Sequence, residues 1–224
     1  MKKIFAISDT HGFHRHVIIP DKIDCLIYAG DSTNSMSLHQ NLEEFEDFFN
    51  WITELNISKK ILIAGNHDIH LTKQYIKDKF KEAGIIYLED EYCDLEGIKV
   101  YGSPWTPRYG DWSFMKDRSK MDPLWRHLDD NIDILVTHGP PAGILDLTED
   151  REYRLAQAGD ISLWKRIVEK RPKYSIFGHI HDFKTCKNFG TMKRDFGTTF
   201  MNVSSVEDGR FDKGLIHNGI VFEI

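Results

Sequence analysis

Residues 61–68 read ILIAGNHD, an apolar run followed by a glycine and then by three polar side chains. The run is unbroken and rich in isoleucine, which is typical of a strand buried on both faces of a sheet. The glycine lets the backbone turn sharply and approach a ligand where the strand ends. Similar apolar runs that stop at a polar residue or a glycine cover residues 3–8, 25–29, 98–101, 132–137 and 174–177.

Segments with helical spacing lie between these runs. Apolar residues recur every three or four positions over residues 42–55, 71–83 and 161–169. This alternation of strand and helix signals predicts an α/β architecture. From residue 198 to 224, further strand patterns are joined by turn signals at Asp208-Gly209 and Asn218-Gly219, so we expect sheets of mixed direction.

The 224 residues contain no internal repeat, low-complexity tract or Pro/Gly/Ser-rich linker, so we expect one domain over residues 1–224. The stretch 102–122 is rich in proline, tryptophan and arginine. It reads as one long loop of the kind that often carries function.

The expected compartment is the cytoplasm. No apolar run approaches the ~20 residues of a membrane span, and the first run stops at Asp9, too soon for a secretory signal. The three cysteines are far apart and read as free thiols in a reducing compartment. We therefore expect no association with a membrane.

The net charge of −6 at pH 7 gives no general attraction to nucleic acid, which is therefore not an expected partner. An acidic protein that handles a phosphate must neutralise it locally, and bound metal cations would do so. Eleven histidines are the unusual feature of the composition, and their positions decide the expected chemistry.

Potential metal ligands cluster directly after the apolar runs. In open α/β sheets, ligand sites form outside the carboxyl ends of the strands. A single histidine or aspartate there is usually a turn or cap residue, but five such blocks in five loops are hard to explain as independent turns. Imidazole and carboxylate ligands together suit Mn²⁺, Fe or Zn²⁺, and a dinuclear site accounts best for their number. The blocks are Asp9-Thr10-His11-Gly12, Gly30-Asp31, Gly65-Asn66-His67-Asp68, Thr137-His138-Gly139 and Gly178-His179-Ile180-His181.

In this order the five blocks resemble the calcineurin-like metallophosphoesterases. Three further stretches, YGSPW at 101–105, DILVTHGPP at 133–141 and IFGHIH at 176–181, resemble the small metallophosphoesterase-domain branch of that superfamily. The resemblance implies a β-sandwich of two mixed sheets flanked by helices, in four layers. It also implies a phosphoesterase with two divalent metal ions, Mn²⁺ first, with Fe, Zn²⁺ or Mg²⁺ as alternatives.

The resemblance implies a role for each block residue. One ion takes Asp9, His11 and His181, and the second takes Asn66, His138 and His179. Asp31 bridges the two ions, and so belongs to the catalytic groups as well as to the ligands. A hydroxide shared by the ions, its pKa lowered toward ~7, would attack phosphorus without a covalent phospho-enzyme.

His67 is the second catalytic residue that the resemblance implies, because it faces the leaving group without binding a metal. A histidine suits proton transfer to a departing alkoxide, since its pKa lies near working pH. The alternative is that His67 only forms a hydrogen bond with a neighbouring loop. Asn34 stands where many relatives have an acidic residue that orients this histidine, so its tuning differs here. Ser35 and Ile69 replace two phosphate-clamping arginines, which disfavours a Ser/Thr protein phosphatase.

Five residues are candidates for contact with the substrate. Trp105 and Arg108, with Trp112 beside them in the predicted long loop, could meet a nucleobase and a phosphate. Trp105 is equally well interpreted as a core anchor. His14 is near enough to the first block to line a pocket, and Asn34 follows the bridging position.

The expected function is hydrolysis of a small phosphodiester, with cyclic nucleotides among the candidates. The preference for a diester rests on the resemblance and on the missing arginines, because a dianionic monoester gains most from such clamps. A phosphomonoesterase for a small metabolite is the main alternative. A nuclease is less favoured by the negative charge. A non-catalytic scaffold should have lost ligands first, and all seven are present.

Overall fold

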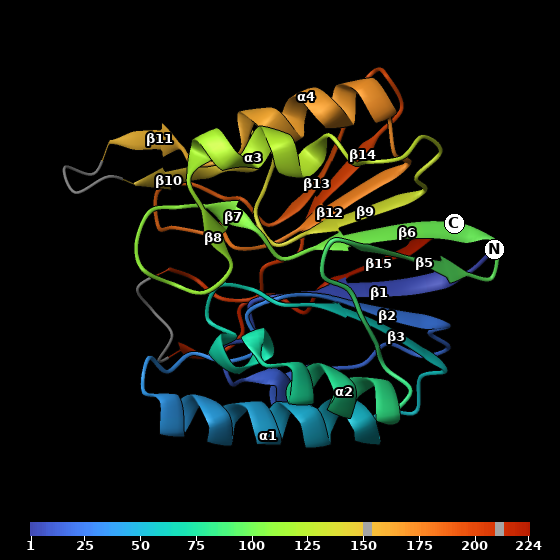
Figure 1. Cartoon of the computed structure of the whole chain (residues 1–224), viewed down its shortest axis with the longest axis vertical. Helices are drawn as coiled ribbons and strands as arrows, with labels where there is room; N and C mark the ends of the chain where they lie inside the picture. The colour runs from blue at the N-terminus through green and yellow to red at the C-terminus, as the bar shows by residue number, and fades with distance from the viewer. Residues whose placement is uncertain (150–153, 209–212) are drawn as a thin grey trace.

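The computed structural model describes residues 1–149, 154–208 and 213–224, and its two large sheets lie face to face (Figure 1). The first sheet has the strand order β15-β1-β2-β3-β4. Neighbouring strands from β1 to β4 are parallel, and β15 pairs antiparallel with β1. The bounds are β1 (Lys3–Ile7), β2 (Cys25–Ala29), β3 (Lys59–Ile63), β4 (Ile86–Tyr87) and β15 (Ile220–Glu223).

The second sheet has the order β13-β14-β12-β9-β6-β5. Its four inner strands are parallel, and β13 and β5 run antiparallel at the two edges. The bounds are β5 (Glu91–Leu95), β6 (Ile98–Ser103), β9 (Ile134–Thr137), β12 (Tyr174–Phe177), β13 (Gly190–Lys193) and β14 (Thr199–Asn202).

Helices cover the outer face of each sheet. The first sheet carries α1 (Leu38–Glu54) and α2 (Gln74–Glu82), and the second carries α3 (Arg118–Trp125) and α4 (Ile161–Lys170) (Figure 1). The resulting order of helices, sheet, sheet and helices confirms the predicted four-layer β-sandwich. Shorter elements are the 3-10 turns η1 (His14–His16) and η2 (Ile69–Thr72) and the strand pairs β7 (Thr106–Pro107) with β8 (Met115–Lys116) and β10 (Leu147–Glu149) with β11 (Leu155–Gln157).

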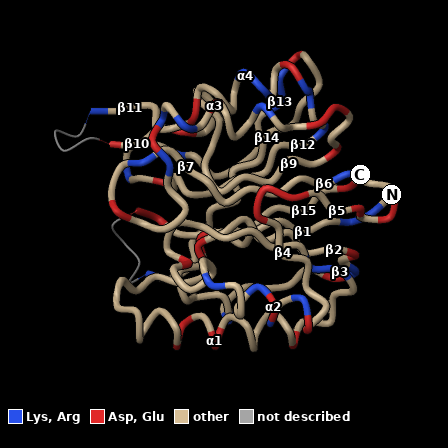
Figure 2. The backbone as a smooth tube through the Cα atoms, viewed as in Figure 1, with Lys and Arg blue, Asp and Glu red and all other residues tan. Residues whose placement is uncertain are grey.

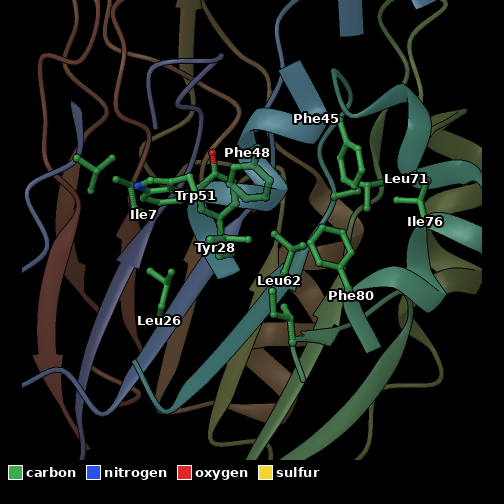
Figure 3. Close-up of a cluster of buried hydrophobic side chains, with 14 of the residues drawn as sticks. Ile7, Leu26, Tyr28, Phe45, Phe48, Trp51, Leu62, Leu71, Ile76 and Phe80 are labelled. Carbon is green, nitrogen blue, oxygen red and sulfur yellow. The ribbon is translucent and has the colours of Figure 1, made fainter. Parts of the chain in front are cut away.

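Three apolar cores separate the four layers. Phe48 of α1 and Phe80 of α2 pack on Tyr28 and Leu62 of the first sheet (Figure 3). A second core, which includes Ile27, fills the space between the sheets. A third lies between the second sheet and α3 and α4. Most lysine, arginine, aspartate and glutamate positions lie on the helices and loops around these cores (Figure 2).

One expectation about local structure was wrong, and one helix is shorter than expected. The stretch 102–122 is not one long loop, because it contains the end of β6, the short pair β7–β8 and the start of α3. Helix α3 escaped recognition because it is short and contains Pro123, although Met121 and Trp125 bury its inner face. The segment 71–83 is divided into η2 and α2.

The turn expected at Asp208-Gly209 lies partly outside the described residues. Within the described ranges, no helix combines the length and the apolar character needed to cross a membrane.

Candidate metal centre

The five polar blocks meet where the carboxyl ends of the two sheets come together. Asp9, Asp31 and Asn66 follow β1, β2 and β3 of the first sheet, whereas His138 and His179 follow β9 and β12 of the second. Each parallel strand therefore delivers its next loop to the same edge of the sandwich. Three groups of side chains bring metal-ligand atoms within 4.8 Å of one another: Asp9, His11 and His181; His11, Asp31 and His67; and Asp31, His138 and His179.

The first group is built around His181. Its Nε2 lies 3.1 Å from Asp9 Oδ1 and 3.3 Å from His11 Nε2. His11 Nε2 in turn lies 3.8 Å from Asp31 Oδ2. All four side chains are at least nine-tenths buried, so these donor atoms face one another rather than water.

The group of Asp31, His138 and His179 is built around His138. Its Nε2 lies 3.1 Å from Asn66 Oδ1 and 3.3 Å from Asp31 Oδ2. The same carboxylate oxygen of Asp31 therefore faces a histidine of each group. This is the position that a bridging ligand would need.

Backbone carbonyls fix the orientation of two of these histidines. His11 Nδ1 donates to the Thr33 carbonyl at 3.2 Å, and His138 Nδ1 donates to the Ala29 carbonyl at 2.8 Å. A carbonyl can only accept, so Nδ1 carries a proton and Nε2 is the atom that faces the cluster. Ligand histidines in metal sites are oriented in this way.

The protonation of the cluster also fits a cation. Burial lowers the pKa of His11 and of His179 to about 3, which keeps both rings neutral. Burial acts on His138 too, but Asp31 outweighs it and raises the pKa of His138 to about 9. Burial would raise the pKa of Asp31, yet the neighbouring His138 outweighs it and holds that pKa well below its ordinary value. A metal ion bound between these groups would take the place of the proton.

The backbone at the cluster is strained. Four of the seven candidate ligands have positive φ angles: Asp9 at 52°, His11 at 44°, Asp31 at 57° and His179 at 67°. Each such conformation costs a non-glycine residue on the order of 1–3 kcal/mol and persists only where the surroundings impose it. Strain concentrated in this way is typical of functional sites.

The block glycines make room for carboxylates from other loops. A Cβ atom on Gly65 would lie 2.2 Å from Asp31 Oδ1, and one on Gly178 would lie 2.0 Å from Asp9 Oδ2. Any side chain at either position would displace a candidate ligand. Close approach therefore requires glycine at both positions, although neither has a positive φ.

Asp68 holds the loop of residues 31–33, which carries Asp31, in place. Its buried carboxylate accepts hydrogen bonds from the backbone N–H groups of Gly65 at 2.7 Å, Asp31 at 2.8 Å, Ser32 at 2.9 Å and Thr33 at 3.2 Å. The sequence placed Asp68 in a block but did not reveal this role, because its partners lie in a loop 36 residues away.

His67 stands beside the cluster, half-buried. Its Nδ1 donates to the backbone carbonyl of Asn34 at 3.1 Å, so the acidic residue expected here in relatives is replaced by a main-chain acceptor. The His67 ring lies 4.6 Å from the ring of His11 and 4.2 Å from that of Trp112. The expected hydrogen bond to a neighbouring loop is present, and it does not use Nε2, the other ring nitrogen of His67.

A cavity of about 330 Å³ opens over the cluster. Besides candidate ligands, it is lined by Asn34, His67, Tyr109, Trp112 and Asp208. Tyr109 and Asp208 were missed in the sequence, because no periodic pattern marks a residue that a loop carries to a site. The structure thus places Asn34 and Trp112 at the cavity, as candidates for contact with the substrate.

Three other candidates for substrate contact are not brought to the cluster. His14 is buried beneath α1, where its Nε2 lies 2.9 Å from Asp47 Oδ2 and its ring packs on Phe48. The side chain of Arg108 is held by Asp117, with Nε donating to Oδ1 at 3.0 Å.

Trp105 acts as a core anchor. Its ring packs against two of the apolar cores, and Nε1 donates to Asp90 Oδ2 at 2.8 Å. The stacking interpretation of Trp105 is therefore not supported.

Comparison with known proteins agrees with this geometry. The family model for calcineurin-like phosphoesterases matches residues 2–183. Human metallophosphoesterase domain-containing protein 1 is 30% identical over 226 residues, which cover 90% of this chain and 65% of that protein. UPF0046 protein K07C11.7 of Caenorhabditis elegans is 28% identical, over 92% of this chain and 71% of its own.

In fold, the chain is similar to the crystal structure of TT1561 of Thermus thermophilus. The TM-score is 0.60 at 13% identity, over 90% of this chain and 88% of that one. The chain spans about two thirds of the length of the human relative, 65%. The match over residues 2–183 shows that this chain belongs to the calcineurin-like phosphoesterase family, in the branch of the metallophosphoesterase domain-containing proteins.

Proposed function

We propose that this chain is a phosphodiesterase that hydrolyses a small phosphodiester with two divalent metal ions, Mn²⁺ by preference. The observation that carries the proposal is the convergence of six buried or half-buried donor side chains from both sheets around the carboxylate of Asp31. Metal-dependent hydrolysis of phosphoesters is the chemistry of the family to which the chain belongs.

The charge of the cavity over the cluster supports a diester. Of the described residues that line this cavity, none is an arginine or a lysine. A dianionic monoester depends more on such cations than a singly charged diester does. Tyr109 and Trp112 offer aromatic surface at the same cavity, which suits a planar substituent such as the base of a cyclic nucleotide.

The chain's own residues have distinct roles in this proposal. Two divalent cations, when bound, would neutralise the phosphate and lower the pKa of a bound water. Asp9, His11 and His181 would hold one cation, and Asn66, His138 and His179 the other. Asp31 would contribute to both sites, and Asp68 fixes the Asp31 backbone. His67 keeps one proton on Nδ1 for the Asn34 carbonyl, so Nε2 is the atom that delivers a proton to the departing oxygen.

The test compares bis-p-nitrophenyl phosphate with p-nitrophenyl phosphate. Metal-stripped protein is reloaded with Mn²⁺, Zn²⁺, Fe²⁺ or Mg²⁺, and release of p-nitrophenol is followed. We expect faster cleavage of the diester, with Mn²⁺ the most effective ion. Faster cleavage of the monoester would replace the proposal with a small-metabolite phosphatase. No cleavage with any ion would refute hydrolysis altogether.

A further inference from the structure

A second cavity, of about 350 Å³, adjoins the metal centre. We call it the side chamber; its lining includes Pro107, Arg118, Pro140, Gly159, Ile180 and Phe183, together with Thr148, Glu149 and Ala158. It shares Tyr109, His179, His181 and Asp208 with the cavity over the cluster. The two cavities are therefore neighbours on either side of these four residues, and a group bound at the cluster can extend into the side chamber.

The two cavities offer different surroundings to the two substituents of a diester. His67 and Trp112 line only the cavity over the cluster. The leaving group must lie there, because His67 is the proposed proton donor. The part of the substrate that stays on the phosphate then has the side chamber available.

Much of the side chamber's wall is apolar. Pro107, Pro140 and Ile180 are buried, and Phe183 is half-buried. Binding sites for organic groups combine such walls with a few placed polar groups. An aryl or otherwise planar body fits this lining.

Arg118 is the one arginine or lysine among the described residues of this lining, whose other charged side chains include the carboxylates of Glu149 and Asp208. It begins α3, and its guanidinium donates to two backbone carbonyls, to Gly159 at 3.0 Å and to Ala158 at 2.9 Å. The loop that carries these carbonyls is itself fixed, since Gly159 N–H donates to the buried Asp146 at 3.1 Å. The guanidinium is thus oriented by the main chain before any ligand binds.

The charge of Arg118 has no carboxylate partner within 4.0 Å among the residues that the structure describes. By contrast, Arg108 pairs with Asp117 and Arg126 pairs with Asp122. A guanidinium has five N–H donors in a planar fork that matches an oxyanion, and two carbonyls leave part of that fork unused.

We propose that the side chamber binds the part of the substrate retained on the phosphate, and that this part carries an oxyanion recognised by Arg118. A carboxylate and a further phosphate present the same chemistry to the guanidinium. This inference rests on the proposed function, since it assigns a second subsite to the same reaction. It makes Arg118 a residue that determines specificity, separate from the metal ligands.

The test uses three diesters with the same p-nitrophenolate leaving group. Their retained groups are 3-carboxyphenyl, 3-phosphonophenyl and the uncharged 3-carbamoylphenyl. We expect wild-type protein to prefer a charged compound over the carbamoyl compound by roughly ten- to a hundredfold in kcat/KM. The charged compound that shows the larger preference identifies the oxyanion.

Variants of Arg118 isolate its contribution. Arg118→Met should bring the preference close to one, and Arg118→Lys, which keeps the charge but not the fork, should give an intermediate value. Arg126→Met, directly after the same helix and outside both cavities, should keep the wild-type preference. Because the preference is a ratio within each protein, changes in folding or metal content cancel. A preference that Arg118→Met leaves intact, or that wild-type protein lacks, overturns the proposal.

Different results would refute the proposed subsite and the proposed function. If no diester is cleaved with any metal, binding of 3-carboxyphenyl phosphonate to Mn²⁺-loaded protein is measured by calorimetry. Tighter binding by wild type than by Arg118→Met would keep the subsite while the phosphodiesterase is lost. Equal binding would remove the subsite as well.

Discussion

Replacing Gly65 by alanine tests whether the glycine of the third block makes room for the Asp31 carboxylate. The added Cβ would lie 2.2 Å from Asp31 Oδ1, 2.5 Å from Asp31 N and 2.6 Å from His138 Cε1. Cβ atoms essentially never approach another heavy atom within 3.0 Å, so the carboxylate must move by about 0.8 Å. Asp31 cannot turn aside freely, because Asp68 accepts from its backbone N–H.

Gly65→Ala should lower both the thermal stability and the turnover of the protein. Forcing one methyl group into a packed site costs about 1–3 kcal/mol, and a protein of this size loses roughly 2–4 °C in Tm per kcal/mol. We therefore expect Tm to fall by roughly 2–12 °C. A displacement near 1 Å at a reacting centre lowers turnover on the order of a hundredfold.

The assay combines thermal unfolding, metal content by mass spectrometry and cleavage of bis-p-nitrophenyl phosphate. Gly84→Ala is the matched control, because its φ of +72° imposes backbone strain while nothing lies within 4 Å of the added Cβ. The control should lose stability yet keep its metal and its activity. Full metal content and turnover in Gly65→Ala would show that the carboxylate does not need the space.

Three further predictions concern other parts of the centre. His67→Ala should keep the metal content and lower turnover by roughly 10²–10⁴-fold, whereas the exposed His39→Ala should change neither; unchanged turnover would remove the proton-donor role of His67. Asp68→Asn replaces one accepting oxygen by an amide N–H donor, which strips at least two backbone N–H groups of their acceptor at roughly 1–3 kcal/mol each. It should therefore lower both Tm and metal affinity. If both stayed at the wild-type values, the loop of residues 31–33 would not need Asp68 to keep its conformation. In the metal-free protein, the pKa of His138 of about 9 gives stability that is complete below pH 6.5 and lost as pH rises toward 9. The pKa of His11 of about 3 means that stability is lost as pH falls below 6.5, because only the unfolded chain then takes the proton. Urea unfolding at pH 5, 6.5 and 8.5 should place the maximum at the middle value, and a steady trend in either direction would contradict it.

The metal centre was largely predictable from the sequence because strand ends are locally encoded. A buried run that stops at a glycine and a ligand residue fixes where the ligand leaves the sheet, and Asp31 and His138 follow their strands as expected. Parallel strands then bring such residues together without further information.

What the sequence could not give depends on contacts between distant segments. His14 is only three residues from His11, but the turn η1 sends its side chain under α1 to Asp47. Conversely, nothing in the local pattern around Tyr109 shows that its loop folds back over His179, where the two rings lie 5.6 Å apart. Nearness along the chain was a poor guide to nearness in space at both positions.

The division of the metal centre between two sheets has a consequence for biosynthesis. Asp9 Oδ1 and His181 Nε2 lie 3.1 Å apart, although the two residues are separated by 172 positions along the chain. Neither half of a nascent chain contains the donor set, and pairing across such distances is slow. Metal uptake should therefore be a late event that reports completed folding. In refolding experiments, a metal indicator should respond only after the fluorescence of Trp51, buried between α1 and the first sheet, has reached its native value.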